Sequence, residues 1–201
     1  MKRRTPLIDW TPKLYDRLSR YYDLAMRFLF PIGSKGHARV ASDLEAGSIL
    51  DIACGTGTLL ALARKAGLDC RGIDTSKGML RQATKKVPSS LYVRADFYHL
   101  PFPDESFDYV VETNALSGVS IDIEKVVEEM IRVCKIGGEV RIGDYATAAK
   151  ETTLTRLIEK ILFLIGDYPY DYVSIFKSRG HDPTHEILGL GGMYQFIRVI
   201  R

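Results

Sequence analysis

Short apolar runs alternate with longer stretches of helical period along most of the chain. The apolar runs have the length of buried strands, and many end beside Gly, Asp or Asn residues. We expect strands at residues 49–52, 69–73, 91–93, 108–112, 139–142, 184–190 and 193–200. Apolar positions three and four apart predict helices at 11–30, 35–45, 57–66, 75–86, 123–134 and 148–165, and one more that ends at Gly180. Strands that alternate with helices in this way are typical of an α/β domain.

The two ends of the chain depart from this alternation. Residues 1–45 contain helical patterns and no strand, so we expect a helical cap followed by a sheet at residues 46–201, all within one domain. Pro31 and Gly33 are expected to end the first helix. The last two strands are joined through the glycine-rich residues 189–192, which predict a hairpin. Gly137 and Gly138 are assigned to the end of the preceding helix and the turn into the next strand.

The first expected strand runs into a turn of small residues, 53–57. Gly55 and Gly57 allow a tight turn and leave room for a ligand to approach the backbone. The helix that follows begins with free N–H groups that point toward such a ligand. A dinucleotide fingerprint requires a third glycine, and Leu60 stands at that position. The turn therefore predicts a ligand site of another kind at the end of this strand.

Acidic residues stand at the ends of three successive expected strands: Asp51, Asp74 and Asp96. Carboxyl ends of parallel strands meet at one edge of a sheet, so these side chains are expected near one another. Asp74 lies at the tip of the second strand, where a carboxylate accepts hydrogen bonds from both ribose hydroxyls of a nucleoside cofactor. Thr75 or Ser76 is able to cap the next helix, which leaves Asp74 available to a ligand.

Four segments together resemble the class I methyltransferases that use S-adenosylmethionine, and specifically the methyltransferase type 11, quinone-biosynthesis and phospholipid methyltransferases. Residues 51–57 match the first motif, D-x-A-C-G-T-G, and residues 95–108 match A-D-x-x-x-L-P-F-x-D-x-S-F-D. Residues 129–138 are similar to E-x-x-R-V-L-K-P-G-G, with Ile136 in place of the proline. Residues 15–24 resemble the family's leading Tyr-Asp segment. The resemblance implies a Rossmann-like, doubly wound sheet of seven strands, mostly parallel with an antiparallel C-terminal hairpin strand.

The same resemblance implies the positions of the cofactor, S-adenosylmethionine, and its product S-adenosylhomocysteine. Asp51 and the glycine turn are expected to hold the methionine part, Asp74 the ribose, Asp96 and Phe97 the adenine. Carbonyls of the turn and an aromatic face from Tyr15 or Tyr22 steady the sulfonium. The expected cofactor-binding residues are Tyr22, Asp51, Ala53, Cys54, Gly55, Gly57, Asp74, Thr75, Met79, Asp96, Phe97 and Asn114. Asp96 also fits ordinary turn chemistry, and Met79 fits a plain core position.

The reacting end of the site has no fixed signature. Asn114 and Ser117 follow the fourth expected strand and are placed to face the transferring methyl group or the acceptor. Candidate catalytic residues are Tyr22, Asn114, His99 and Tyr170, and a general base is needed only for some acceptors. Because the cofactor supplies the reactivity, the protein has mainly to place the acceptor near attack distance. His181 and His185 flank Pro183, which argues against a helical metal site, so we expect no metal.

Composition bounds the remaining choices. Residues 1–40 hold nine Lys or Arg against three Asp, whereas the whole chain has a net charge of +3. This basic segment and the apolar residues 28–32 are compatible with contact with a membrane surface, although a solvated helix face explains the basic residues better and plain core is the alternative for residues 28–32. The three cysteines have no metal-like spacing, and we expect a reduced, cytoplasmic protein. No basic–aromatic RNA motif occurs, so we expect no nucleic-acid partner. The oligomeric state stays open.

Three functions are weighed. The first is an S-adenosylmethionine-dependent methyltransferase that acts on a small or lipid-like acceptor, such as a quinone or a phospholipid. The second is a nicotinamide-dependent oxidoreductase, which shares the fold and Asp74 but requires the missing third glycine and a Tyr-x-x-x-Lys pair, absent from the sequence. The third is a cofactor-binding module without catalysis, suggested by the basic first 40 residues. The order and spacing of the motifs favour the methyltransferase.

Overall fold

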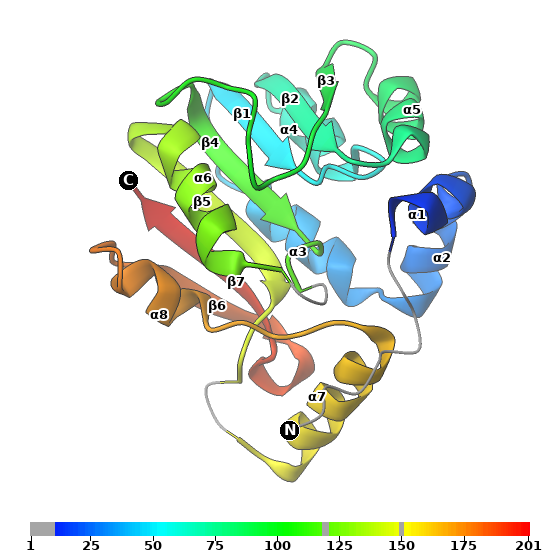
Figure 1. The fold of residues 1–201 in the computed structure, drawn as a ribbon, viewed down its shortest axis with the longest axis vertical. Helices are drawn as coiled ribbons and strands as arrows, with labels where there is room; N and C mark the ends of the chain where they lie inside the picture. The colour runs from blue at the N-terminus through cyan, green and yellow to red at the C-terminus, as the bar shows by residue number, and fades with distance from the viewer. Residues whose placement is uncertain (1–10, 118–120, 149–150) are drawn as a thin grey trace.

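The computed structural model describes residues 11–117, 121–148 and 151–201. Within them, seven strands form one sheet in the order β3-β2-β1-β4-β5-β7-β6 (Figure 1). The strands are β1 (Ser48–Ile52), β2 (Asp69–Asp74), β3 (Leu91–Arg94), β4 (Phe107–Thr113), β5 (Cys134–Tyr145), β6 (Thr184–Gly189) and β7 (Tyr194–Ile200). β7 is antiparallel to β5 and β6, and the other neighbours are parallel. The predicted fold class is confirmed.

Helices cover both faces of the sheet. They are α1 (Pro12–Leu18), α2 (Tyr22–Leu29), α3 (Ile32–Val40), α4 (Thr58–Lys65), α5 (Lys77–Lys86), α6 (Ile123–Val133), α7 (Thr153–Ile165) and α8 (Tyr172–Lys177), and a short 3₁₀ turn spans Leu190–Gly192. Successive strand residues point to opposite faces, so Leu50 packs toward α6 and α8 while Ile49 packs toward α3 and α4. Both faces are apolar, which explains the continuous apolar runs of the inner strands.

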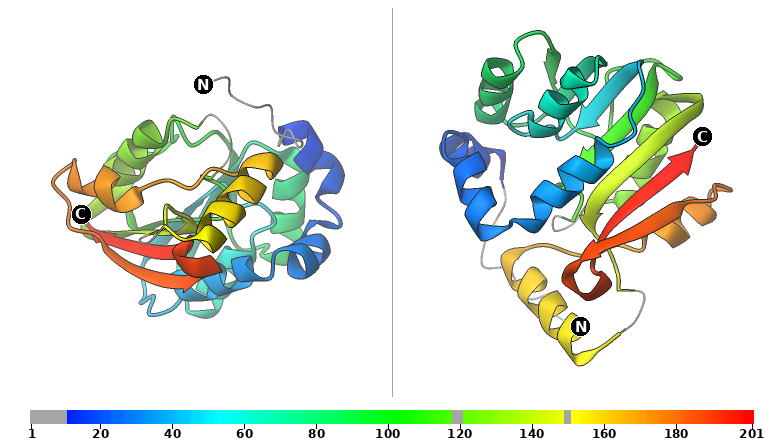
Figure 2. Two further views of the ribbon diagram at one scale, coloured as in Figure 1. Left: turned by 90° about the horizontal axis from the view of Figure 1, so that it is seen from below. Right: turned by 180° about the vertical axis from the view of Figure 1, so that it is seen from behind.

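The strand order reverses between β1 and β4, because β1 pairs with β2 on one side and with β4 on the other. A crevice forms at such a point, outside the carboxyl ends of the strands. Helices α1, α2 and α7 lie at that end of the molecule, as Figures 1 and 2 show from three sides. Any ligand in the crevice is therefore bordered by these helices as well as by the strand ends.

The single helix expected at residues 11–30 is two helices, α1 and α2, separated by a turn at 19–21. The Ser19 hydroxyl donates to the Asp16 carbonyl, which competes with helix continuation. The turn also packs on α5, where a Cβ on Gly78 would lie 2.8 Å from the Asp16 backbone and 2.9 Å from Ser19 Oγ. Close packing on a glycine, which helical period alone does not reveal, therefore accounts for the break.

The prediction that Gly33 interrupts a helix, with the next one at 35–45, is also wrong. Helix α3 begins at Ile32 and ends at Val40, so that Gly33 and Gly36 lie inside it. Their missing side chains leave room for two residues of the sheet: an added Cβ on Gly33 would lie 3.3 Å from the Asn114 side chain, and one on Gly36 would clash with the Tyr194 hydroxyl. These glycines therefore bring α3 close to the carboxyl ends of β4 and the start of β7.

Three other boundaries differ from the predictions. Helix α7 begins at Thr153, capped by Thr152 and Thr155, and not at 148; residues 149–150 lie outside the described residues. Helix α6 ends at Val133 and β5 begins at Cys134, so Gly137 and Gly138 lie inside a strand and do not cap the helix. An added Cβ on Gly138 would lie 2.8 Å from the Asp108 carbonyl of β4, so this glycine permits close strand packing.

Candidate cofactor and acceptor site

The turn after β1 has a backbone conformation that few side chains tolerate. Ala53, Gly55 and Gly57 all have positive φ angles, of 57°, 53° and 76°. A Cβ added to Gly55 would meet nothing within 4 Å, whereas one on Gly57 would lie 3.1 Å from Ala83 of α5. Gly57 therefore serves packing and Gly55 borders open space. The Cys54 thiol points away from that space, because a Cβ on Gly72 would lie 2.8 Å from Cys54 Sγ.

Asp51 is buried at the end of β1, with only 2% of its surface exposed. Its Oδ1 atom has no hydrogen-bond partner among the described residues. Burial, with a smaller contribution from Asp74, raises the pKa of this carboxyl well above its usual value. An unpartnered buried carboxylate is costly, and the ammonium group of a methionine moiety is a partner of the right charge.

Asp74 ends β2 and ties the neighbouring loops together. Its Oδ2 accepts from the Gly55 N–H at 2.9 Å and its Oδ1 from the Ser76 N–H at 2.8 Å. Ser76 in turn caps α5 by accepting from the Met79 N–H, so the prediction of Thr75 or Ser76 as the cap narrows to Ser76. Each carboxylate oxygen keeps a second lone pair, which leaves capacity for two ribose hydroxyls. Burial raises the pKa of Asp74 despite these hydrogen bonds.

A cavity of about 30 Å³ opens beside Asp74, lined by Ala53, Ile73, Asp74, Thr75, Ala95 and Phe97. Four of the predicted cofactor residues therefore come together here: Ala53, Asp74, Thr75 and Phe97. The open space at Gly55, the orphaned oxygen of Asp51 and this largely apolar lining fit the methionine, ribose and adenine parts of S-adenosylmethionine. The cavity alone is smaller than an adenine ring.

The other residues predicted for the adenine end are less closely grouped. Asp96 is half exposed and its Oδ1 accepts from the Tyr98 N–H at 2.8 Å, which is the turn chemistry weighed above. Met79 is buried at the start of α5. His99 is largely exposed, with one ring nitrogen 3.8 Å from Asp96 and the other 3.2 Å from Lys125. These contacts leave His99 on the outer side of the loop after β3.

The cap helices are attached to the cofactor end by two aspartates that sequence reasoning did not single out as anchors. Asp16 of α1 accepts from the Ser76 hydroxyl at 2.7 Å and the Gly78 N–H at 2.6 Å, and these hydrogen bonds lower its pKa. Asp23 of α2 accepts from Lys86 of α5 at 2.6 Å and from the Thr56 hydroxyl of the glycine turn. The position of α1 and α2 therefore depends on the same turn and helix that border the cofactor cavity.

Tyr15 of α1 and Tyr22 of α2 pack against each other, with their rings 6.0 Å apart, edge to face. Burial raises the pKa of both phenols, and the charges of Asp74 and of a further carboxylate, Asp167, contribute to the rise, which reaches about 12 for Tyr22. The same two acids thus influence both tyrosines.

Asp167 follows α7 directly and was not predicted. Ser117 donates to its Oδ1 at 3.4 Å. Burial, together with the charge of Asp144, raises the pKa of Asp167 to about 7. Burial and the charges of Asp167 and Asp144 also raise the pKa of Tyr145, at the end of β5. Asp167 is preceded by Gly166, which ends α7 with a φ of 94°. In the sequence, Gly166 and Asp167 together indicate only the end of a helix and give no sign of a functional carboxylate.

Two buried carboxylates hold the loop after β4. Glu112 accepts from the Ala115 N–H at 2.6 Å, and Asp144 accepts from the N–H groups of Leu116 and Ser117, both at 2.9 Å. Burial and mutual repulsion raise the pKa of Glu112, and burial raises that of Asp144. These hydrogen bonds hold Asn114 with a φ of 60°.

Two of the catalytic candidates already have hydrogen-bond partners. Asn114 accepts from the Tyr194 hydroxyl at 2.6 Å and packs against Gly33 of α3. Its side chain is therefore held between α3 and β7. Tyr170 donates to the Ile121 carbonyl at 3.1 Å and packs against the core on the α6 side. Neither geometry tests a role in chemistry, and both assignments stay predictions.

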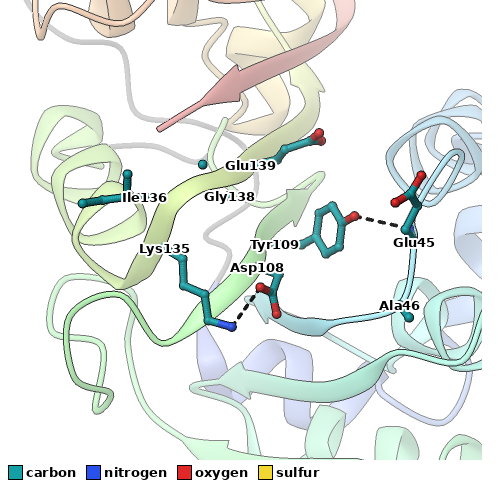
Figure 3. Close-up of a pocket in the computed structure, with 9 residues that line it drawn as sticks. Glu45, Ala46, Asp108, Tyr109, Lys135, Ile136, Gly138 and Glu139 are labelled. Carbon is teal, nitrogen blue, oxygen red and sulfur yellow. Dashed lines mark hydrogen bonds and ion pairs between the residues drawn. The ribbon is translucent and has the colours of Figure 1, made fainter.

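A larger cavity, about 240 Å³, lies at the amino ends of the strands and far from this crevice. Figure 3 shows Lys135 paired with Asp108 there, and Tyr109 accepting from the Glu45 N–H. The hydrogen bonds from Lys135 and Ser48 lower the pKa of Asp108 to about 2. Lys135, Asp108 and Glu139 of this cavity thus already have charged partners. No group of three or more metal-binding side chains occurs in the part of the chain that the structure describes.

Comparison with known proteins decides the family. Residues 50–142 match the model of the methyltransferase domain. The chain is 33% identical over 208 aligned positions to the phosphatidylethanolamine N-methyltransferase of Cereibacter sphaeroides, which covers 92% of this chain and 98% of that protein. The chain belongs to the S-adenosylmethionine-dependent methyltransferase family. The nicotinamide-dependent alternative is therefore set aside.

Other relatives differ in length. The demethylmenaquinone methyltransferase of Paenarthrobacter aurescens is 32% identical over 69% of this chain, and the chain spans 56% of its length. The chain spans about three fifths of the length of two further demethylmenaquinone methyltransferases. Among solved structures, phosphoethanolamine N-methyltransferase 2 of Haemonchus contortus has a TM-score of 0.72 at 17% identity, over 96% of this chain and 61% of that one. This likeness concerns the fold alone.

Proposed function

We propose that this protein transfers a methyl group from S-adenosylmethionine to the amine nitrogen of a small or lipid-linked acceptor. The observation that carries the proposal is Asp167, a largely buried carboxylate that accepts from Ser117 of the loop after β4 and whose charge raises the pKa of Tyr15, Tyr22 and Tyr145. A carboxylate among aromatic rings suits a cationic ammonium group, through its charge and through the ring faces. A neutral quinol has no positive charge for such a group to attract. The relative of nearly equal length is a phosphatidylethanolamine N-methyltransferase.

Asp51, Gly55, Asp74 and Phe97 would hold the cofactor by the groups described above. When bound, S-adenosylmethionine supplies a methyl group on a sulfonium, which leaves as a neutral thioether when the acceptor nitrogen attacks. The protein's part is placement in a site sheltered from water, an effect worth up to about 7–11 kcal/mol.

An ammonium acceptor must lose a proton before its nitrogen has a lone pair to attack with. Because burial raises the pKa of Asp167 to about 7, transfer of a proton from an ammonium group to this carboxylate is less uphill, by about 3 pKa units, than transfer to an ordinary carboxyl with a pKa near 4. Before that step the carboxylate attracts the ammonium, and the ammonium in turn lowers the pKa of Asp167. The proton passes from nitrogen to the Asp167 carboxylate and then to water. Tyr22 and Tyr145, whose raised pKa keeps both phenols neutral, offer hydroxyls that orient the acceptor.

A quinone acceptor is the second candidate, because several relatives are demethylmenaquinone methyltransferases. The two are separated by a transfer assay with labelled S-adenosylmethionine over phosphoethanolamine, phosphatidylethanolamine vesicles and a reduced demethylmenaquinone. We expect transfer to the amines and none to the quinol. Transfer to the quinol alone would refute the amine proposal. Binding of S-adenosylhomocysteine without transfer to any acceptor would favour the non-catalytic module.

A further inference from the structure

The outer face of α7 is apolar although nothing in the described structure covers it. Leu154, Leu157, Ile161 and Leu164 are 44–58% exposed and follow one another at spacings of three, four and three residues. That spacing places them on one side of the helix. The inner side is occupied separately, by Leu162 with Ile158 and Ile165, in a cluster with Tyr145 and Tyr194. The helix thus has two apolar sides and needs only one for its own packing.

A second exposed apolar row runs along α1 and α2. Leu18, Tyr21, Leu24 and Phe28 are 40–75% exposed. Helix α3, which follows α2, connects the two rows, because Ile32 at its start packs with the inner residues of α7. Figures 1 and 2 show α2 and α7 at the same end of the molecule, where the parallel strands have their carboxyl ends. We call these two rows the apolar rim. Within the earlier range 28–32, Phe28 belongs to the rim while Ile32 packs inward.

The charge beside the α1–α2 row has one sign. Both acidic residues of α1 and α2 are already engaged by other elements: Asp16 accepts from Ser76 and Gly78, and the half-exposed Asp23 accepts from Lys86 and Thr56. The basic residues stay outside, and those with no ion pair among the described residues are Lys13, Arg17, Arg20, Arg27 and Lys35. The hydrogen bonds of the two aspartates therefore leave the rim with an unneutralised positive border.

We infer that the apolar rim docks on the surface of an anionic lipid bilayer, with the basic residues of α1 and α2 on the head groups. Exposed apolar side chains beside unpaired cations fit an interfacial binding mode, in which the side chains enter the head-group and acyl boundary. No helix in the described ranges is long and apolar enough to cross a membrane. A protein partner of the usual kind would not require so one-sided a charge. Docking in this orientation turns the mouth of the crevice toward the bilayer.

The test is co-sedimentation of the whole chain with vesicles of phosphatidylcholine alone or mixed with phosphatidylglycerol. We expect binding only to the mixed vesicles, and release when salt rises from about 0.1 M to about 1 M, where the Debye length falls from about 10 Å to about 3 Å. Arg17→Gln with Arg27→Gln should weaken binding about 25-fold, at about five-fold per charge. The matched control, Lys65→Gln with Lys177→Gln, removes two exposed cations elsewhere and should change it less than about two-fold.

The apolar row is tested separately. Leu157→Ser with Ile161→Ser should weaken binding at least about ten-fold, since these side chains leave water on docking. The control is Ile136→Ser with Ile187→Ser, two side chains of similar exposure, 75% and 54%, away from the rim. Equal loss in test and control variants, or no binding to the mixed vesicles, would overturn the inference. So would a stable dimer that buries the rim, seen as a halved mass in the Leu157/Ile161 variant.

The docking inference rests on the exposed residues of the apolar rim and not on the identity of the methyl acceptor. Methyl transfer to soluble phosphoethanolamine, or to phosphatidylethanolamine dispersed in detergent, reports the proposed function without any vesicle. Absence of transfer to both amines with intact vesicle binding would refute the amine proposal alone, whereas transfer to either amine without vesicle binding would refute the docking surface alone.

Discussion

The cofactor end and the acceptor end of the crevice are built in different ways. At the proposed cofactor end, the groups come from the ends of three neighbouring strands, in residues 51–57, 74–76 and 95–97, and Asp74 ties the first two together through backbone N–H groups. At the proposed acceptor end, Tyr22, Tyr145 and Asp167 come from three distant parts of the chain, and each position depends on a helix or strand packing correctly. The first is set by the strand ends of the fold, and the second is an assembly of side chains.

The largest effect is expected at the acceptor end, from Asp167→Asn. The amide cannot accept the ammonium proton or attract the cation, so methyl transfer to phosphoethanolamine should fall about 10²–10⁴-fold. Affinity for S-adenosylhomocysteine, measured by calorimetry, should stay within about three-fold of the unsubstituted protein. Asp182→Asn, at an exposed site after α8, is the control. A fall in both the transfer rate and the affinity for S-adenosylhomocysteine would mean that Asp167 affects the cofactor end as well as the acceptor end.

The same substitution should stabilise the protein at alkaline pH. The folded state holds the Asp167 proton up to about pH 7, whereas the unfolded chain releases it near pH 4, so folding stability falls as pH rises between these values. Asp167→Asn escapes that loss. We expect the free energy of unfolding of the Asp167→Asn variant to exceed that of the unsubstituted protein by about 1–3 kcal/mol at pH 8, a figure reduced because the side chain is partly exposed. Below pH 4 the two free energies should be equal. Denaturant melts at the two pH values measure this, and an equal difference at both would contradict it.

Next in size is Asp74→Ala at the cofactor end. Loss of hydrogen bonds to a charged acceptor should weaken S-adenosylhomocysteine binding about 10–100-fold. Stability should fall by a smaller factor, since the lost hydrogen bonds to Gly55 and Ser76 are partly offset by the relief of burying a carboxyl whose pKa burial raises. Asp69→Ala, at the exposed start of the same strand, is the matched control. Unchanged binding in the Asp74 variant would remove this residue from the site.

A smaller loss of cofactor affinity should distinguish two glycines that share a positive φ angle. Gly55 and Gly67 both have positive φ and nothing within 4 Å of an added Cβ, so alanine should cost each about 1 kcal/mol of stability. Only Gly55 borders the crevice. Gly55→Ala should therefore weaken S-adenosylhomocysteine binding about ten-fold and Gly67→Ala should not, by calorimetry on both. Equal binding by the two variants would place the cofactor away from the turn.

The smallest effect on activity and stability is expected at Asp23, which joins α2 to α5 and to the glycine turn. Asp23→Ala removes a half-exposed contact to Lys86, so stability should fall by no more than about 1 kcal/mol. Because α2 carries Tyr22, the KM for the acceptor should rise a few-fold with little change in kcat. Asp43→Ala, which removes another exposed ion pair, should change neither constant. A fall in kcat without a change in KM would contradict this role for the contact.

The two ends also differ in how far sequence predicts them. Asp51 and Gly55 are recognisable because strand, acid and turn follow one another within a few residues, and Asp74 is recognisable because it ends the next strand, which pairs in parallel with the first. Asp167 carries no such signal, since an aspartate after a helix-ending glycine is common and its neighbours are distant in the chain. The break at residues 19–21 and the start of α3 at Ile32 were missed because they depend on glycines packed against other elements.

A crystal structure with S-adenosylhomocysteine and phosphoethanolamine tests the central claim most directly. The account predicts ribose hydroxyls on the Asp74 carboxylate and the amine nitrogen within hydrogen-bond distance of Asp167, beside Tyr22. An amine bound elsewhere, or an Asp167 carboxylate turned away from it, would contradict the account.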